Sequence, residues 1–360
     1  MDRRSFLKWL TAFFAILLGA GAGTVLSGLR RKSGLSDREA AVVQAEEAEE
    51  LPAGEDLQLP DDPQAGKALA TFAIMSDIHA SPDDPLTLEH FKSALSDMTA
   101  MKQPVDVLLL TGDCTDYGRE RDYKELGRLM KAYKLPPVHA NMGNHEYYDL
   151  WLDKAGEFNR EGMPNGKTDA MARERFLKFF GYKQPYNRMD LEGCTILLLS
   201  QEGYMQEKPE AGEGAWYTDA QMEWFKAQLA GLDRTARIFI MIHQPLPMQG
   251  RSGGSHQIVR GKEIRELIAP YKNVFVFCGH RHQDFQNGSA HYLQEPFHYF
   301  HNSSVGRTLN KALPDARKSK TQGLYVQVFE NKVVVRGRDY AQRRWLKEAH
   351  WTVALNKKSV

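Results

Sequence analysis

The sequence is poor in cysteine and in unbalanced charge. Only three cysteines occur among 360 residues, Cys114, Cys194 and Cys278. An odd number at wide spacing excludes a disulfide framework, although one disulfide stays possible, and small buried thiols are our interpretation. The formal net charge is +1, which gives no strong field to attract nucleic acid. A length of 360 residues allows one large α/β domain with extra segments, or two smaller domains, and a hydrophobic content of 42% is enough for a sizeable core.

A pair of arginines and an apolar run open the chain. Arg3-Arg4 precedes the run, which extends from Trp9 to Leu29. This order resembles a bacterial twin-arginine export signal, which we assign to residues 1–32. The alternative is an uncleaved membrane anchor, because about 20 apolar residues can span a bilayer and Arg30-Arg31-Lys32 follows the run. Either way, we expect a periplasmic or extracellular protein, or one attached to the outer face of the cytoplasmic membrane.

Three further parts follow the N-terminal segment. Residues 33–67 contain several acidic pairs and few large apolar residues, so we interpret them as a flexible linker. Residues 68–345 are predicted to form the folded domain, and residues 346–360 a C-terminal tail. The export machinery is an expected partner, and the membrane is expected as a partner only through the N-terminal segment.

Apolar runs of strand length alternate with helical patterns in the folded domain. Early strands are predicted at 70–75, 105–110 and 138–142, with helices at 85–101 and 119–133. Later strands are predicted at 195–199, 237–242 and 274–277, with helices at 168–180, 219–232 and 258–271. A hairpin is predicted from 324–329 and 332–338. This alternation is typical of βαβ units and a partly parallel sheet.

Five of these strands end in residues that can bind metal ions. The segments are Asp77-Ile78-His79, Gly112-Asp113 with Asp116, Gly143-Asn144-His145-Glu146, His243 and Gly279-His280-Arg281-His282. Ligands of open α/β sheets bind beyond the carboxyl ends of the strands, so the five segments should face one crevice. Glycine before the ligand in three segments would let the chain turn sharply. Carboxylate, amide and imidazole donors suit Mn, Fe, Zn or Ni, and one shared carboxylate can bridge two ions.

Over about residues 68–282 these motifs resemble the calcineurin-like metallophosphoesterase superfamily. The resemblance implies a four-layer sandwich of two mixed β-sheets flanked by helices, and a phosphoesterase with two divalent metal ions. It implies that Asp77, His79 and His282 hold one ion. It implies that Asn144, His243 and His280 hold the second, and that Asp113 bridges both.

The resemblance also assigns two residues that do not bind metal. His145 corresponds to the family's histidine beside the leaving group, which makes it the expected catalytic residue. Asp116 stands where the purple acid phosphatases of this superfamily have an iron-binding tyrosine. This difference argues against a tyrosinate-bound Fe(III) site, and we interpret Asp116 as a group that fixes its loop.

Several alternatives remain open at the level of sequence. The substrate is expected to be a phosphate ester, either a monoester or a diester such as a cyclic nucleotide. A binding module without turnover is the rival class, although the complete set of histidines argues against it. The basic segment 307–320 is interpreted as a solvated loop, and no nucleic acid is expected.

Several further residues are candidates for contact with the substrate or for packing. Arg251 and His256 lie in a glycine-rich loop and are candidate phosphate contacts. Tyr147 and Tyr148 either line the pocket or pack. Segments 150–182 and 203–214 are expected to shape specificity. Four further histidines are expected to lie on the surface or to pack: His139, His291, His298 and His301.

Overall fold

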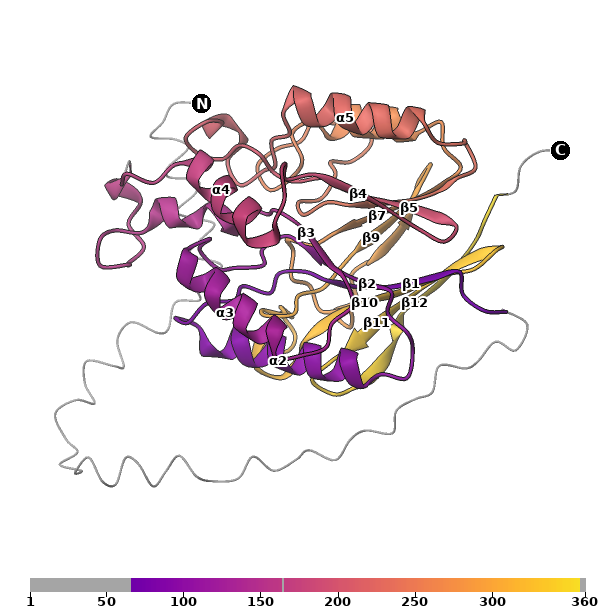
Figure 1. Ribbon diagram of the computed structural model, residues 1–360, viewed down its shortest axis with the longest axis horizontal. Helices are drawn as coiled ribbons and strands as arrows, with labels where there is room; N and C mark the ends of the chain where they lie inside the picture. Colours follow the sequence, from indigo (N-terminus) through magenta and orange to yellow (C-terminus); the bar gives the residue numbers. More distant parts are fainter. Residues whose placement is uncertain (1–65, 164, 357–360) are drawn as a thin grey trace, which may run out of the picture. The chain divides into compact units, whose positions relative to one another are not determined.

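Two mixed β-sheets of six strands each form the centre of the computed structural model, which describes residues 66–163 and 165–356 (Figure 1). The first sheet has the order β12-β11-β10-β1-β2-β3 and the second the order β4-β5-β6-β7-β9-β8. The strands of the first sheet are β1 (Ala70–Met75), β2 (Val107–Thr111), β3 (Val138–Asn141), β10 (Gln322–Val328), β11 (Lys332–Asp339) and β12 (Arg344–Ala354). Those of the second are β4 (Asn187–Leu191), β5 (Cys194–Leu198), β6 (Arg237–Met241), β7 (Asn273–Cys278), β8 (Tyr292–Gln294) and β9 (His298–His301).

Strand direction brings the ends that carry the motifs together. β1, β2 and β3 are parallel to one another, and so are β5, β6, β7 and β9. The carboxyl ends of parallel strands meet at one edge of a sheet. The predicted hairpin is confirmed, because β10 and β11 pair antiparallel.

Helices cover the outer faces of both sheets, which completes the expected four layers. α2 (Pro85–Ala100) and α3 (Glu120–Lys131) lie on the first sheet, and α5 (Asp219–Ala230) lies on the second (Figure 1). α6 (Gly261–Ile268) packs with α5 against β6 and β7. The side chain of Thr218 caps α5 by accepting a hydrogen bond from the backbone N–H of Gln221.

The remaining helical segments are short or belong to the middle of the chain. They are η3 (His145–Trp151), η4 (Arg160–Gly162), α4 (Asp169–Phe180), η5 (Pro209–Ala211) and α7 (Ala316–Ser319). α4 packs beside η3, the 3-10 helix that begins within the Gly-Asn-His-Glu motif.

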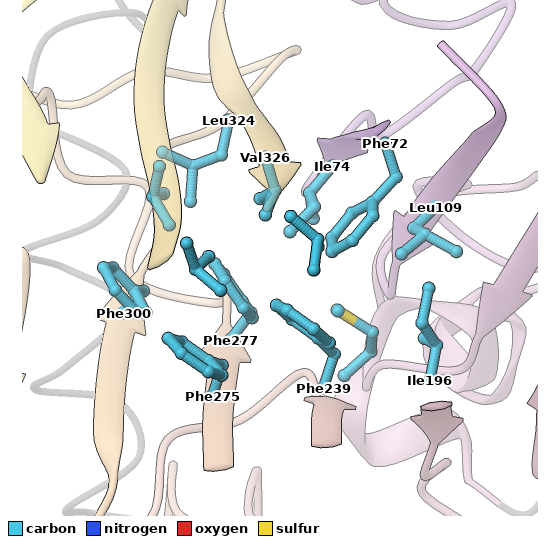
Figure 2. Packing of buried hydrophobic residues seen from close by; sticks show 14 of the residues in the cluster. Phe72, Ile74, Leu109, Ile196, Phe239, Phe275, Phe277, Phe300, Leu324 and Val326 are labelled. Carbon is cyan, nitrogen blue, oxygen red and sulfur yellow. The ribbon is translucent and has the colours of Figure 1, made fainter. Parts of the chain in front are cut away.

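The core lies between the facing sheets. Figure 2 shows side chains of the first sheet, among them Phe72 and Val326, meeting those of the second, among them Phe239 and Phe277. The Phe239 ring stacks on Phe275 at a centroid distance of 4.9 Å and meets Phe72 edge-on at 5.1 Å. Burying each such ring stabilises the fold by about 1.5–3 kcal/mol. The sandwich therefore gives the strand ends a rigid base.

The C-terminal boundary predicted at residue 345 is wrong. β12 continues to Ala354 and pairs with β11 along its length, with Val353 opposite Val333. Residues 346–354 thus belong to the first sheet and not to a tail. Polar residues interrupt β12 and its pairing is irregular near Gly337, so the sequence lacks the clean alternation that predicts a strand. The short strands β4, β8 and β9 were missed as well.

The predicted export signal, residues 1–32, lies outside the described residues, as does the predicted linker except for its last two positions. Within the part of the chain that the structure describes, no helix is both long enough and apolar enough to cross a bilayer.

One buried carboxyl at the end of β11 gives a prediction about stability and pH. Burial raises the pKa of Asp339 to about 6 from 3.8, against the lowering effects of a backbone N–H from Gln342 and the charge of Arg344. The folded state therefore holds this proton more tightly than the unfolded chain. The stability that it contributes is complete below pH 3.8 and is lost as the pH rises through about 6.

We expect Asp339→Asn to be more stable than the wild type at about pH 8, by about 1–3 kcal/mol, and nearly equal to it at about pH 4. Asparagine keeps an acceptor for Gln342 and has no charge to bury. Urea unfolding of the metal-free proteins at both pH values measures this difference. A stability difference that does not change with pH would contradict the prediction.

Candidate metal centre

All seven predicted metal ligands lie at the same edge of the sandwich. Asp77, His79, Asp113 and His282 form one group whose donor atoms lie within 4.8 Å of one another. Asp113, His243 and His280 form a second group by the same measure. The segments that carry these side chains follow β1, β2, β3, β6 and β7, and the structure brings the side chains together as the sequence led us to expect.

Neighbouring nitrogen and oxygen atoms of the first group lie 2.9–3.9 Å apart. His282 Nε2 lies 2.9 Å from Asp77 Oδ1 and 3.0 Å from His79 Nε2. His79 Nε2 lies 3.9 Å from Asp113 Oδ2. Nitrogen and oxygen donors that converge in this way are spaced to surround one cation.

The second group shares an atom with the first. His243 Nε2 lies 3.0 Å from Asp113 Oδ2, the same oxygen that faces His79. Asn144 Oδ1 lies 3.1 Å from His280 Nδ1, which places the amide in this group. Asp113 Oδ2 therefore stands between the two sets, as expected for a bridging carboxylate.

Two atoms that could bind metal at the shared position lack a hydrogen bond. Asp113 Oδ2 and His243 Nε2 are fully buried, and neither has a hydrogen-bond partner with acceptable geometry among the described residues. Buried polar atoms without partners are costly and rare. A cation between them would satisfy both, so the residues present fit a metal ion.

The charges of the site favour the same conclusion. Burial lowers the pKa of His243, but the nearby carboxylates of Asp113 and Asp77 raise it to about 10. Burial, helped by the positive charges of His145 and Arg307, lowers the pKa of His79 to about 3. The carboxylates thus attract positive charge, and a metal ion would compete with the proton on His243.

The backbone is strained at the candidate ligands. Seven non-glycine residues have positive φ in the described part of the chain, and five of them are candidate ligands. These five are Asp77, His79, Asp113, His280 and His282, with φ between 49° and 70°. Left-handed φ is unfavourable for residues with a Cβ and persists mainly where the surrounding structure imposes it, often at functional sites.

The glycines before the ligands serve two different needs. Gly112 has φ of +81°, which confirms the expected sharp turn there. Gly143 and Gly279 do not have positive φ, so a sharp turn is not their reason. A Cβ at Gly143 would collide with Asp113, and one at Gly279 would collide with Ser76. These two positions need glycine because Asp113 and Ser76 approach the backbone too closely to leave room for a side chain.

His145 has one ring nitrogen occupied by the protein. Its Nδ1 lies 2.9 Å from the backbone oxygen of Asp116, to which it can donate. The ring stacks on Tyr148 at 3.9 Å between centroids and meets His79 edge-on at 4.3 Å. Burial lowers the pKa of His145, but the carboxylates of Asp113 and Asp116 together raise it by more, so the net shift of the pKa is upward. His145 thus stands beside the first group with Nε2 on the opposite edge of its ring.

The two tyrosines left open by the sequence differ. Tyr148 lies against His145 and contacts the site. Tyr147 is fully buried and donates to the backbone oxygen of Gln201, so it packs.

No role was expected for Arg307, and the interpretation of segment 307–320 as a solvated loop is wrong at both of its ends. Arg307 donates to both oxygens of Asp116 at 2.7 Å and to Asp84 at 3.0 Å. Lys320 is buried and pairs with Asp284 at 2.6 Å. Asp116 lies 3.2 Å from the Nδ1 atoms of both His79 and His145. Arg307 therefore fixes a carboxylate that contacts a candidate ligand and the candidate catalytic histidine.

Glu146 connects the loops after β2 and β3. Its carboxylate accepts hydrogen bonds from the backbone N–H groups of Asp113, Thr115 and Gly143 at 2.8–3.0 Å. Burial, with the charge of Asp113, raises the pKa of Glu146 to about 7. The last residue of Gly-Asn-His-Glu thus holds the loop that carries the shared aspartate.

Of the two candidate phosphate contacts, only one lies beside the site. His256 lies beside the second group, with Nδ1 3.2 Å from His280 Nε2, whereas Arg251 is exposed. The three cysteines are buried and free. His139, His291, His298 and His301 lie outside both groups and contact neighbouring side chains or backbone.

The fold and this site together define a metallophosphoesterase. More specifically, the chain belongs to the calcineurin-like phosphoesterase family, whose sequence profile matches residues 70–284. It is therefore a hydrolase acting on phosphoester bonds, and the family generally uses a pair of metal ions.

Individual relatives are distant. A 3',5'-cyclic-nucleotide phosphodiesterase of Nostoc sp. is 22% identical over 267 residues, which cover 69% of this chain and 87% of the relative. The glycerophosphodiester phosphodiesterase GpdQ of Enterobacter lignolyticus is 22% identical over 190 residues, covering 52% of this chain and 60% of the relative. Among solved structures, a dimetal phosphatase from Danio rerio has a TM-score of 0.59 at 13% identity, covering 81% of this chain and 100% of that one. This last likeness shows the fold.

Proposed function

We propose that the protein hydrolyses phosphodiesters with two divalent cations held by the seven side chains described above. The observation that carries the proposal is the position of Asp113 Oδ2, which faces His79 of one group and His243 of the other. Two carboxylates, one amide and four imidazoles form the donor set, and no thiolate takes part. Such donors suit Mn, Fe, Zn or Ni.

Bound there, the cations would supply Lewis acidity and a water molecule of lowered pKa. The chain's own residues would orient the reaction. Asp77, His79 and His282 would fix one side of the site, and Asn144, His243 and His280 the other. In-line attack needs the leaving oxygen opposite the attacking water, near a group that can donate a proton.

His145 is the residue that we assign to the leaving oxygen. Its Nδ1 is held by the backbone oxygen of Asp116, which fixes the ring orientation and leaves Nε2 for the substrate. The carboxylates of Asp113 and Asp116 raise its pKa, which favours the protonated form. His145 would thus protonate the leaving group as a general acid.

A diester is favoured over a monoester for two reasons. The two relatives compared above are a cyclic-nucleotide and a glycerophosphodiester phosphodiesterase. Arg307, which contacts the site through Asp116, is already paired with Asp116 and Asp84. A diester carries one negative charge and a monoester nearly two, so a diester needs less additional positive charge from the protein.

We also propose that the protein acts outside the cytoplasm, after export by the twin-arginine machinery. The support is the Arg3-Arg4 pair with the apolar run that follows it. Fractionation of the native host, with and without a functional twin-arginine pathway, tests this. Equal amounts in the cytoplasm of both strains would contradict it.

The activity is tested with a substrate panel on the purified full-length protein, stripped of metal and reloaded with Mn²⁺. The panel holds bis-p-nitrophenyl phosphate, p-nitrophenyl phosphate and a cyclic nucleotide. We expect turnover only with metal and a higher kcat/KM for the diesters. Preference for p-nitrophenyl phosphate would indicate a phosphatase. Two bound Mn²⁺ without turnover of any member would favour a binding module.

A further inference from the structure

The buried carboxylate of Glu213 accepts a hydrogen bond from the side-chain amide of Asn144. Glu213 Oε2 accepts a hydrogen bond from Asn144 Nδ2 at 3.0 Å and from the Tyr148 hydroxyl at 2.9 Å. Glu213 Oε1 accepts from the Tyr204 hydroxyl at 2.7 Å. Glu213 is only 2% exposed, so water does not replace these contacts.

The contacts fix which atom of the amide faces the metal centre. A carboxylate can only accept, so it selects the NH₂ group of Asn144. The oxygen of the amide is then turned to the other side, where Oδ1 lies 3.1 Å from His280 Nδ1. The reverse orientation would place the amide oxygen against Glu213 Oε2, oxygen to oxygen. Asn144 Nδ2 also contacts the Tyr148 hydroxyl at 3.1 Å, which holds the same orientation.

The charge of Glu213 matters as well. The first group contains two carboxylates, Asp77 and Asp113, whereas the second has only the shared Asp113. The donors to Glu213 named above are a neutral amide and two phenols, so no side-chain cation among these partners offsets its charge. A cation held by Asn144, His243 and His280 would interact favourably with this charge.

The segment that carries Glu213 is anchored by aromatic side chains. Tyr204 is fully buried and accepts a hydrogen bond from Trp151 Nε1 at 3.0 Å. These contacts connect segment 203–214, which we expected to shape specificity, to the second group of candidate ligands.

We propose that Glu213 is a positioning residue that aims Asn144 Oδ1 at the second cation and raises the affinity for that cation. This inference rests on the proposed function, because it takes Asn144 to be a ligand. Groups behind a metal ligand commonly contribute 10–100-fold to affinity, by the general rule for such partners.

Glu213→Gln tests the proposal, since a glutamine can turn an NH₂ group toward Asn144 and carries no charge. We expect the first Mn²⁺ to bind as in the wild type and the Kd of the second to rise by ~10–100-fold. Calorimetric titration of the metal-free protein with Mn²⁺ gives both constants. Electron paramagnetic resonance should show the spectrum of isolated Mn²⁺ at concentrations where the wild type shows a coupled pair. A second Mn²⁺ bound with the wild-type Kd would overturn the proposal.

Glu202→Gln is the matched control. Glu202 is also a buried glutamate of this part of the chain, but it accepts from Thr218 and Gln221 and does not contact Asn144. Both Mn²⁺ constants should stay at the wild-type values in this variant. A similar loss in both variants would mean that Glu213 acts only through general stability, and would overturn the proposal.

A charge exchange keeps the test valid should Glu213→Gln fail to fold. Asn144→Asp alone places two carboxylates about 3 Å apart, where like charges repel, and should lose the second Mn²⁺. In the double variant Asn144→Asp with Glu213→Gln, the new amide at position 213 can donate a hydrogen bond to the new carboxylate at position 144. This variant should therefore bind the second Mn²⁺ again. Equal binding by the single and the double variant would overturn the proposal.

The wild-type titration separates the two levels of inference. Fewer than two Mn²⁺ bound by the wild type would contradict the proposed function. Two ions bound equally well by the wild type and by Glu213→Gln would contradict only the role of Glu213.

Discussion

Asp113→Ala is expected to lose the paired metal site and to lower kcat/KM by ~10³-fold or more, because several kcal/mol of transition-state stabilisation depend on the metals. Asp113 Oδ2 is the atom that faces both ligand groups. Without it, each group keeps only neutral donors, apart from Asp77 in the first. Elemental analysis of the purified variant should show fewer than two ions per chain.

Asp113 also has a structural contact, which needs a control. Its Oδ1 accepts a hydrogen bond from the backbone N–H of His145 at 2.9 Å. Asp113→Asn preserves an acceptor for this bond while removing the charge. We expect the asparagine variant to keep the wild-type unfolding midpoint in the metal-free state and still to bind metal poorly. Two ions and full activity in either variant would show that the bridge is assigned to the wrong residue.

His145→Ala is expected to lower kcat by ~10²-fold or more while the metal content stays intact. The side chain lies beside the first group, but it is not one of the seven proposed ligands. Its role in protonation predicts a dependence on the leaving group. The loss should be large for a diester with an alkoxide leaving group and small for a p-nitrophenyl ester, whose phenolate leaves without a proton.

Kinetics with both kinds of ester on metal-loaded protein measure this dependence. His139→Ala is the matched control, since His139 lies outside both groups and contacts Tyr182. It should retain the wild-type kcat with every substrate. An equal loss for both esters in His145→Ala would contradict a role in proton donation, and loss of metal would instead make His145 a ligand.

The candidate ligands could be predicted because their signals are local. Each stands directly after a short apolar strand, as Asp77 does after β1 and His280 after β7. Burial on both faces makes such strands apolar throughout. The polar residues at their ends then have a common place in any parallel sheet. Local sequence was therefore enough to predict that the five segments face one crevice, whereas the four layers of the fold were implied by the resemblance to the family.

The partners of those ligands could not be predicted in this way. Glu213 meets Asn144 across 69 positions, and Arg307 meets Asp116 across 191. Neither residue follows a strand or belongs to a motif, and each looked like part of a polar loop. A contact of this kind depends on how the loops cross above the sheets. The hydrophobic periodicity of the sequence predicts helices and strands but not the paths of these loops.

By itself, then, the sequence determined which side chains are available to bind metal and at which strand ends they stand. Only the tertiary structure decided that Asp113 Oδ2 faces both groups, that Asn144 is turned by Glu213, and that residues 346–354 complete a sheet. The physical reason is that strand formation and chain turns depend on neighbours along the chain. Hydrogen bonds between distant loops depend instead on the packing of the two sheets, which fixes where each loop begins.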